Sequence, residues 1–249
     1  MIDKNSSFLA QHFARLQKVE ETTIRGLGKE CTHLFIDIWN DWFEILSAIN
    51  HTYSKEELVN SVVYFYLQAL SKECGWLQLL FLSGNYPLLG RCLRFIWEMI
   101  YRAHYVDMFE GEKQPGPSVD LRMAWLSQRE EANQLNWNHC IKPALFRVFP
   151  LAEREKEVEQ FYHRLWQQLN KYAHPSTTLF SRIIDNGLLL VTDGFDETWA
   201  REALDVATEI FDLVWLAVIN RFQSCAKHLA QKGLLVEYRV TQLVLKELK

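Results

Sequence analysis

Apolar residues recur at three- and four-residue spacing along most of the chain, which is typical of amphipathic α-helices. The spacing predicts two helices within residues 7–49, separated near Gly26 and Gly28, and further helices over 54–83, 87–110, 119–134, 143–149, 153–173 and 196–230. Residues 110–118 contain several Gly and Pro and predict a loop, and residues 187–194 fit a short extended or hairpin segment. The pattern after residue 234 favours no single structure. We therefore expect an all-α protein.

Composition supports long helices in one or two domains. The 249 residues are 49% hydrophobic and include nine Trp and fifteen Phe but only ten Gly and six Pro, too few for a turn-rich β protein. We expect a helical core over residues 54–231, an N-terminal helical extension over 1–53 that packs on it, and a C-terminal tail over 232–249.

The net charge and the cysteines indicate which partners and which cellular compartment to expect. The formal net charge is −4 and the pI is about 6.1, so contact with nucleic acid would need a local basic patch. The five cysteines are widely spaced in apolar helical patterns, which predicts reduced thiols in a cytoplasmic protein: Cys31, Cys74, Cys92, Cys140 and Cys225. Residues 1–10 lack an apolar signal segment, and no run reaches the roughly 20 apolar residues of a membrane span, so we expect no membrane partner.

The central helix predicted over 87–110 places charges inside an apolar stretch. Arg94 and Glu98 are four residues apart, so they share one side of the helix and can pair. Such a pair is either a salt bridge at the edge of the core or part of a groove in which Arg91 or Arg94 holds an anion. Arg102 and His104 continue this polar side by one turn.

His174 stands at a predicted helix end because Pro175 disfavours helical angles in the residue before it. A terminal histidine can cap a carbonyl, bind a metal or act as a base. A metal would need further ligands, and the chain has no HExxH and only two loose pairs, Glu159 with His163 and His104 with Asp107. We therefore expect no metal and no other cofactor.

Two segments carry a resemblance to known proteins. Residues 84–98, GNYPLLGRCLRFIWE, and residues 169–176, LNKYAHPS, resemble an uncharacterised prokaryotic family of the HEPN-like helical superfamily, and the similarity extends over residues 55–225. In that family a helix with Arg-x-x-x-Glu packs beside a helix that ends in His-Pro-Ser. The resemblance implies a bundle of four or more helices, commonly dimeric. Many HEPN-like proteins are metal-independent ribonucleases of toxin and antiviral systems.

The nucleolytic motif of that superfamily, Arg-polar-x-x-x-His, is incomplete here. The resemblance places Asn170 at the polar position and His174 as the general base, but Leu169 stands where the arginine is expected. Without a cation at the scissile phosphate the developing charge is unstabilised, which costs orders of magnitude in rate. Arg94, Arg164 or Arg91 would have to supply the charge from elsewhere.

These observations lead to one expectation and two alternatives. We expect an HEPN-like bundle with additional N-terminal helices, acting as an interaction or nucleic-acid-associated module of a defence or mobile-element system. It would be a homodimer with RNA or a nucleotide as partner. Its groove would combine catalytic or binding residues Arg94, Asn170 and His174 with binding residues Arg91, Glu98, Arg102, His104 and Ser176. The alternatives are a metal-independent endoribonuclease with His174 as general base, and a nucleotide or small-ligand sensor.

Overall fold

The computed structural model describes residues 3–108, 118–132, 134–148, 155–173, 197–235, 238, 240–242 and 245. The described ranges are almost entirely helical and contain no strand, which confirms the all-α class. The helices are α1 (Asp3–Thr52), α2 (Lys55–Val59), α3 (Val62–Leu82), α4 (Tyr86–Asp107), α5 (Val119–Glu131), the π-helix η1 (Trp137–Ile141), α6 (Lys142–Val148), α7 (Glu155–Ala173), α9 (Glu197–Arg221), the 3₁₀-helix η3 (Gln223–Cys225) and α10 (Ala226–Gln231). None of these helices has the length and apolar character needed to cross a bilayer.

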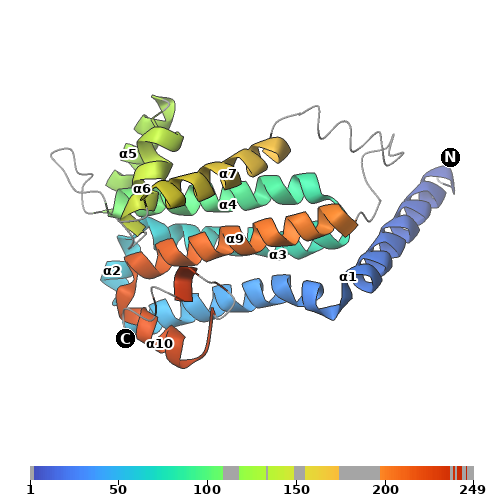
Figure 1. Cartoon of the computed structure of the whole chain (residues 1–249), viewed down its shortest axis with the longest axis horizontal. Helices are drawn as coiled ribbons and strands as arrows, with labels where there is room; N and C mark the ends of the chain where they lie inside the picture. The colour runs from blue at the N-terminus through green and yellow to red at the C-terminus, as the bar shows by residue number, and fades with distance from the viewer. Residues whose placement is uncertain are drawn as a thin grey trace.

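The long helices pack in two layers. Neighbours α1, α3 and α4 form one layer, with α3 in the middle, while α9 packs chiefly on α4 and also on α1, and α7 packs on α4 (Figure 1). The buried side chains form one continuous core, in which α4 and α9 contribute Trp97, Tyr101, Phe211 and Trp215. Residues from 27 to 245 belong to that core, so the predicted N-terminal extension and C-terminal tail share it with the middle of the chain.

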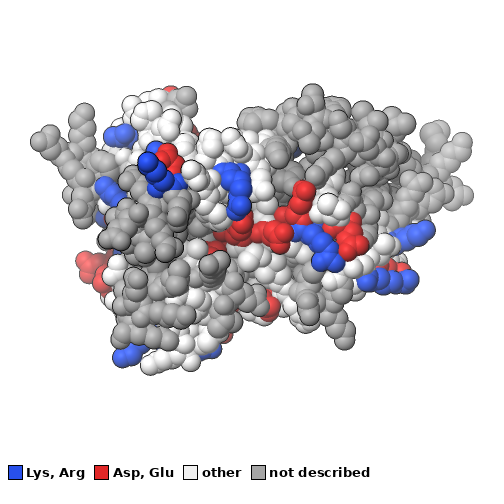
Figure 2. All heavy atoms as spheres, in the orientation of Figure 1, with Lys and Arg blue, Asp and Glu red and all other residues white. Residues whose placement is uncertain are grey.

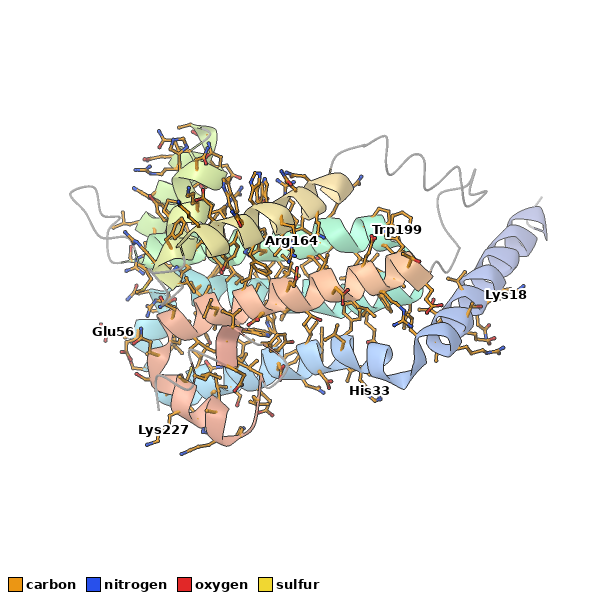
Figure 3. The ribbon with its side chains drawn as sticks, in the orientation of Figure 1. Lys18, His33, Glu56, Arg164, Trp199 and Lys227 are labelled. Atoms are coloured by element: carbon orange, nitrogen blue, oxygen red, sulfur yellow. The ribbon has the colours of Figure 1, made fainter. Side chains whose placement is uncertain are left out.

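The predicted break near Gly26 and Gly28 is wrong. One helix, α1, runs through it, and the helix changes direction between Lys18 and His33 (Figures 1 and 3). Glycine weakens a helix without removing its backbone hydrogen bonds, so the chain bends at this point and does not end the helix.

The predicted helix over 54–83 is two helices. The capping box at its start is confirmed, with the Ser54 amide 2.8 Å from Oε2 of Glu57 and the Glu57 amide 3.3 Å from Oγ of Ser54. However, α2 ends at Val59 and a second helix begins at Val62. The helix predicted over 196–230 likewise ends at Arg221 and continues as η3 and α10. Of the predicted loop over 110–118, residues 110–117 lie outside the described residues, as does the extended segment predicted at 187–194, while Ser118 is the N-cap of α5.

The interruption before α3 has a partner far along the chain. Asp107, the last residue of α4, accepts hydrogen bonds from the Ser61 hydroxyl at 2.6 Å and from the amides of Val62 and Val63 at 3.0 and 3.1 Å. These amides are first-turn donors without a partner inside the helix, and a carboxylate also complements the positive end of the helix dipole. Asp107 therefore fixes the start of α3 against the end of α4.

Two arginines neutralise this carboxylate. The Asp107 side chain is fully buried, and it lies 2.8 Å from Nη1 of Arg122 on α5 and 3.3 Å from Nε of Arg221 at the end of α9. Arg122 also donates to the backbone carbonyl of Asn60 at 2.8 Å. One buried carboxylate thus joins the ends of α3, α4, α5 and α9.

A second buried carboxylate holds the tail. Asp212, in the middle of α9, accepts from the amides of Val240 and Thr241, each at 2.8 Å, and its backbone carbonyl accepts from the Thr241 hydroxyl. Burial raises the pKa of Asp212, while these hydrogen bonds lower it. The tail, whose structure the sequence left open, forms a helical turn at 240–242 over this carboxylate.

We expect Asp107→Asn to lower the free energy of unfolding by roughly 3–5 kcal/mol, because two partly buried guanidinium groups lose their counter-charge. Urea denaturation measures the change. Glu20→Gln, which removes a charge from an exposed position of α1, should change stability by less than about 0.5 kcal/mol. Equal losses in the two variants would contradict a structural role for Asp107.

Candidate functional site

Arg94 and Glu98 pair on α4, as their spacing predicts. Nε of Arg94 lies 2.6 Å from Oε1 of Glu98, and the two side chains are 19% and 15% exposed. The pair therefore lies at the edge of the core and is partly open to solvent.

The Arg94 guanidinium also reaches α7. Its Nη1 donates to Oδ1 of Asn170, and its central carbon lies 4.4 Å from the ring centroid of Trp166. Arginine stacks well on tryptophan because its planar cation meets the negative face of the ring. The structure thus brings together three of the residues predicted to form the groove, Arg94, Glu98 and Asn170.

Arg102 extends this cluster along α4. Its Nη2 lies 3.2 Å from Oε2 of Glu98, and its Nη1 lies 3.4 Å from Oε1 of Glu130 on α5. Each oxygen of Glu98 therefore faces a different arginine. Glu98 thus lies between two guanidinium groups, and Glu130, whose side chain is 68% exposed, is a second carboxylate for Arg102.

The predicted end of α7 is confirmed at Ala173, while His174 and Ser176 lie outside the described residues. Leu169, at the position where the resemblance would place an arginine, is fully buried in the core. Among the three arginines considered as substitutes, Arg94 reaches the motif, because it bonds to Asn170, four residues before His174. Arg164 on α7 instead pairs with Glu209 at 3.0 Å.

His104 does not lie in the groove. It is fully buried, and its Nε2 lies 2.9 Å from Oδ1 of Asn220 on α9. Burial lowers its pKa from 6.5 to about 4, against opposing effects of Asn220 and Asp107. The expectation that His104 continues the polar side of α4 is therefore wrong: His104 follows Arg102 by two residues, which is about 200° around the helix, so its side chain points to the opposite side, into the core. Arg91 is exposed, one turn before Arg94.

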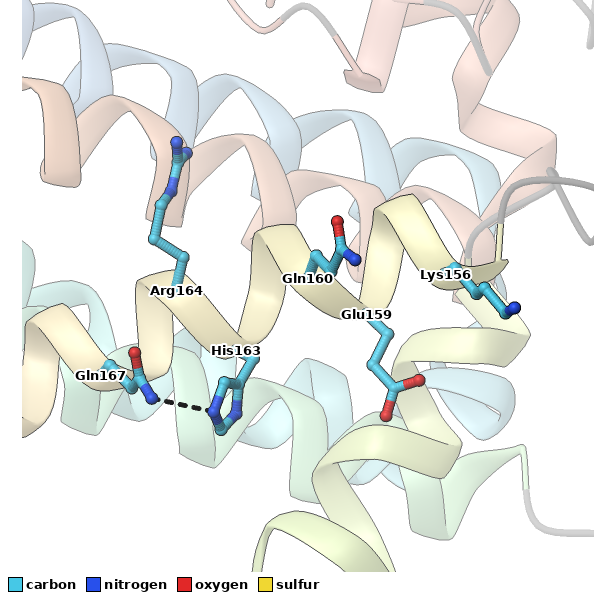
Figure 4. A pocket seen from close by; sticks show the side chains of 6 residues that line it. All are labelled: Lys156, Glu159, Gln160, His163, Arg164 and Gln167. Atoms are coloured by element: carbon cyan, nitrogen blue, oxygen red, sulfur yellow. Dashed lines mark hydrogen bonds between the residues drawn. The ribbon is translucent and has the colours of Figure 1, made fainter.

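The outer side of α7 carries a separate polar hollow (Figure 4), lined by Lys156, Glu159, Gln160, His163, Arg164 and Gln167. Glu159 pairs with Lys142, and Nε2 of His163 lies 2.9 Å from Nε2 of Gln167. In the second loose pair, His104 bonds to Asn220 and Asp107 bonds to Arg122. Within the described ranges, no three potential metal ligands gather at one place.

The sequence did not identify two cluster residues that come from other helices, Trp166 on α7 and Glu130 on α5. Trp166 was recognised only as part of an apolar side, although its ring lies against Arg94 and 5.2 Å from the ring of Trp137. Glu130 gave no signal, because a lone acid at the end of a helix is usually solvated. Only the packing of α5 and α7 beside α4 brings these residues to the cluster.

We expect Glu98→Ala to lower the free energy of unfolding by roughly 2–3 kcal/mol, since it leaves Arg94 without its acidic partner and Arg102 with only the exposed Glu130. The matched control is Glu197→Ala, which removes an exposed four-residue partner of Arg201 and should cost less than about 0.5 kcal/mol. Urea midpoints compare the two. A urea midpoint of Glu98→Ala equal to that of the wild type would contradict a structural role for Glu98.

We expect the free energy of unfolding to depend on pH because His104 is buried. Its pKa is about 4 in the folded protein and ordinarily 6.5, so the unfolded chain binds more protons as the pH falls from about 6.5 to about 4. The stabilisation that depends on a neutral His104 is complete above about pH 6.5 and is lost as the pH falls from about 6.5 to about 4. Between about pH 7.5 and about pH 5 the wild type should lose roughly 2 kcal/mol more than His104→Gln. Curves of the free energy of unfolding against pH that run parallel for the wild type and His104→Gln would contradict this prediction.

Comparisons of the chain with protein-family models, with curated proteins and with solved structures found no match. Among the described side chains, the cluster of Arg94, Glu98, Arg102, Trp166 and Asn170 has the most defined chemistry.

Proposed function

We propose that this protein is a helical binding module for a phosphate-bearing ligand, RNA or a nucleotide, with Arg94 as the residue that contacts the phosphate. The observation that carries the proposal is the fixed position of the Arg94 guanidinium, between Glu98, Asn170 and the ring of Trp166. A guanidinium held in place loses little side-chain entropy when it binds an anion.

Charge supports the same site. Arg94 and Arg102 lie on either side of Glu98, so a phosphate that approaches this point meets guanidinium groups that can form charge-assisted hydrogen bonds with it. Arg94 donates to Glu98 through Nε and to Asn170 through Nη1, and its Nη2 donates to none of the described residues. By contrast, Figure 2 shows a band of acidic side chains across the face formed by α9, where Glu202, Asp205 and Glu209 lie, and that face would repel phosphate.

The HEPN-like resemblance adds the biological setting. It suggests a role in a defence or mobile-element system of the cytoplasm, and a homodimer as the working form. The position of Arg94, bonded to Asn170 four residues before His174, keeps the endoribonuclease as a second candidate: Arg94 would stabilise the phosphate and His174 would take the proton of the ribose 2′-hydroxyl.

We expect Arg94→Gln to weaken binding of a short single-stranded RNA at least about tenfold, because a charge-assisted contact to phosphate is lost. Titration calorimetry in EDTA measures the affinity. Arg201→Gln, which removes a charge from an exposed i,i+4 pair on α9, should bind like the wild type. Arg94→Lys keeps the charge and should recover only part of the affinity.

Equal RNA affinity of folded Arg94→Gln and wild type would remove the proposed site. The same mixtures, analysed on denaturing gels, separate the two candidate activities. Intact RNA supports a binding module, whereas cleavage that disappears in His174→Ala supports the ribonuclease.

A further inference from the structure

One face of the helical layer is unusually apolar. The described part of the chain has ten large apolar side chains with strong exposure, and seven lie on α3, α4 and the part of α1 after the bend. We call this surface the apolar face, and its members are Ile36, Phe43, Phe65, Trp76, Leu79, Leu88 and Phe95.

The spacing of these residues places them on one side of each helix. Ile36 and Phe43 are seven residues apart on α1, and Leu88 and Phe95 are seven apart on α4. Seven residues make about two helical turns, so both members of each pair point in the same direction. On α3, Trp76 and Leu79 lie opposite the buried side of that helix.

Close packing joins the three helices into one surface. A Cβ atom on Gly75 of α3 would lie 2.5 Å from the ring of Trp39 on α1, so the Trp39 ring packs directly on the α3 backbone there. Trp39 in turn lies 5.0 Å, between ring centroids, from exposed Phe43. A tight turn through Gly84, with φ of 71°, brings α4 back along α3.

The exposed area is that of a protein interface. The seven side chains are 39–56% exposed. With about 150–250 Å² for each complete aromatic side chain and somewhat less for aliphatic ones, they leave on the order of 600 Å² of apolar surface in water. That is at the upper end of patches on monomeric proteins, about 300–600 Å². It also approaches the roughly 800 Å² that each partner buries in a stable complex.

We propose that a second copy of this chain covers the apolar face, so that two layers of α1, α3 and α4 stack against each other. Most soluble oligomers are symmetric pairs in which the same patch meets itself, and the face is broad enough for such a pairing. Its four exposed aromatic rings, together with Arg91 and the half-buried Met99, also match the residues enriched in interface cores. The inference rests on the homodimer proposed above but is independent of the phosphate site.

The test is the mass of the full chain in solution, by light scattering and sedimentation over a range of concentrations. The wild type should show twice the chain mass of 29.4 kDa. Leu79→Glu and Trp76→Glu should each raise the dissociation constant at least about 30-fold, as expected for a residue worth 2 kcal/mol or more at an interface.

The matched control is Leu121→Glu. Leu121 on α5 is 54% exposed, as is Leu79, but lies outside the apolar face, so this variant should remain a dimer. Circular dichroism confirms that each variant is folded, and phosphate binding by the monomeric variants separates this inference from the Arg94 site.

A wild type of single-chain mass at every accessible concentration would overturn the inference, as would a dimer unaffected by both substitutions. A monomer that sediments with vesicles of phosphatidylcholine and phosphatidylserine would assign the face to a lipid surface instead.

Discussion

The carboxylate of Asp107 joins four helix ends through five donors from distant parts of the chain. A buried charge is costly unless it is fully paired, so α3, α5 and α9 must all be in place before Asp107 can be buried. This requirement fixes the helices relative to α4, and it explains why α3 begins at Val62 and does not continue from α2. Since α7 packs on α4, the Arg94 cluster forms on the arrangement of helices that Asp107 holds together.

The carboxylates of Asp107 and Glu98, both on α4, differ in what surrounds them. Asp107 is completely enclosed, and backbone amides, a hydroxyl and two arginines occupy its lone pairs. Glu98 also faces two arginines, but its own side chain is 15% exposed and one of these arginines stacks on Trp166. The same chemistry therefore serves structure where the carboxylate is closed off from solvent, and it forms the anion site that we propose where the carboxylate is partly open.

Sequence reasoning succeeded where the information is local. Helix periodicity, the Ser54 capping box, the end of α7 before Pro175 and the Arg94–Glu98 pair all depend on residues within one or two turns. It failed for His104, because a step of two residues from Arg102 turns the side chain from the edge of the helix into the core. It also could not identify Trp166, Glu130 or the roles of Asp107 and Asp212, whose partners lie tens of residues away and become neighbours only through packing.

The central claim is that the Arg94 side chain is already held in position before it meets a phosphate. The most direct measurement is the ¹⁵N–¹H resonance of Arg94 Nε, assigned by comparison with Arg94→Lys, in the free protein and with added RNA. The account predicts a signal protected from exchange with water in the free protein, because Nε donates to Glu98, and a shift of that signal when RNA binds. An Nε proton that exchanges as fast as that of an exposed arginine, or a protected signal unmoved by bound RNA, would contradict it.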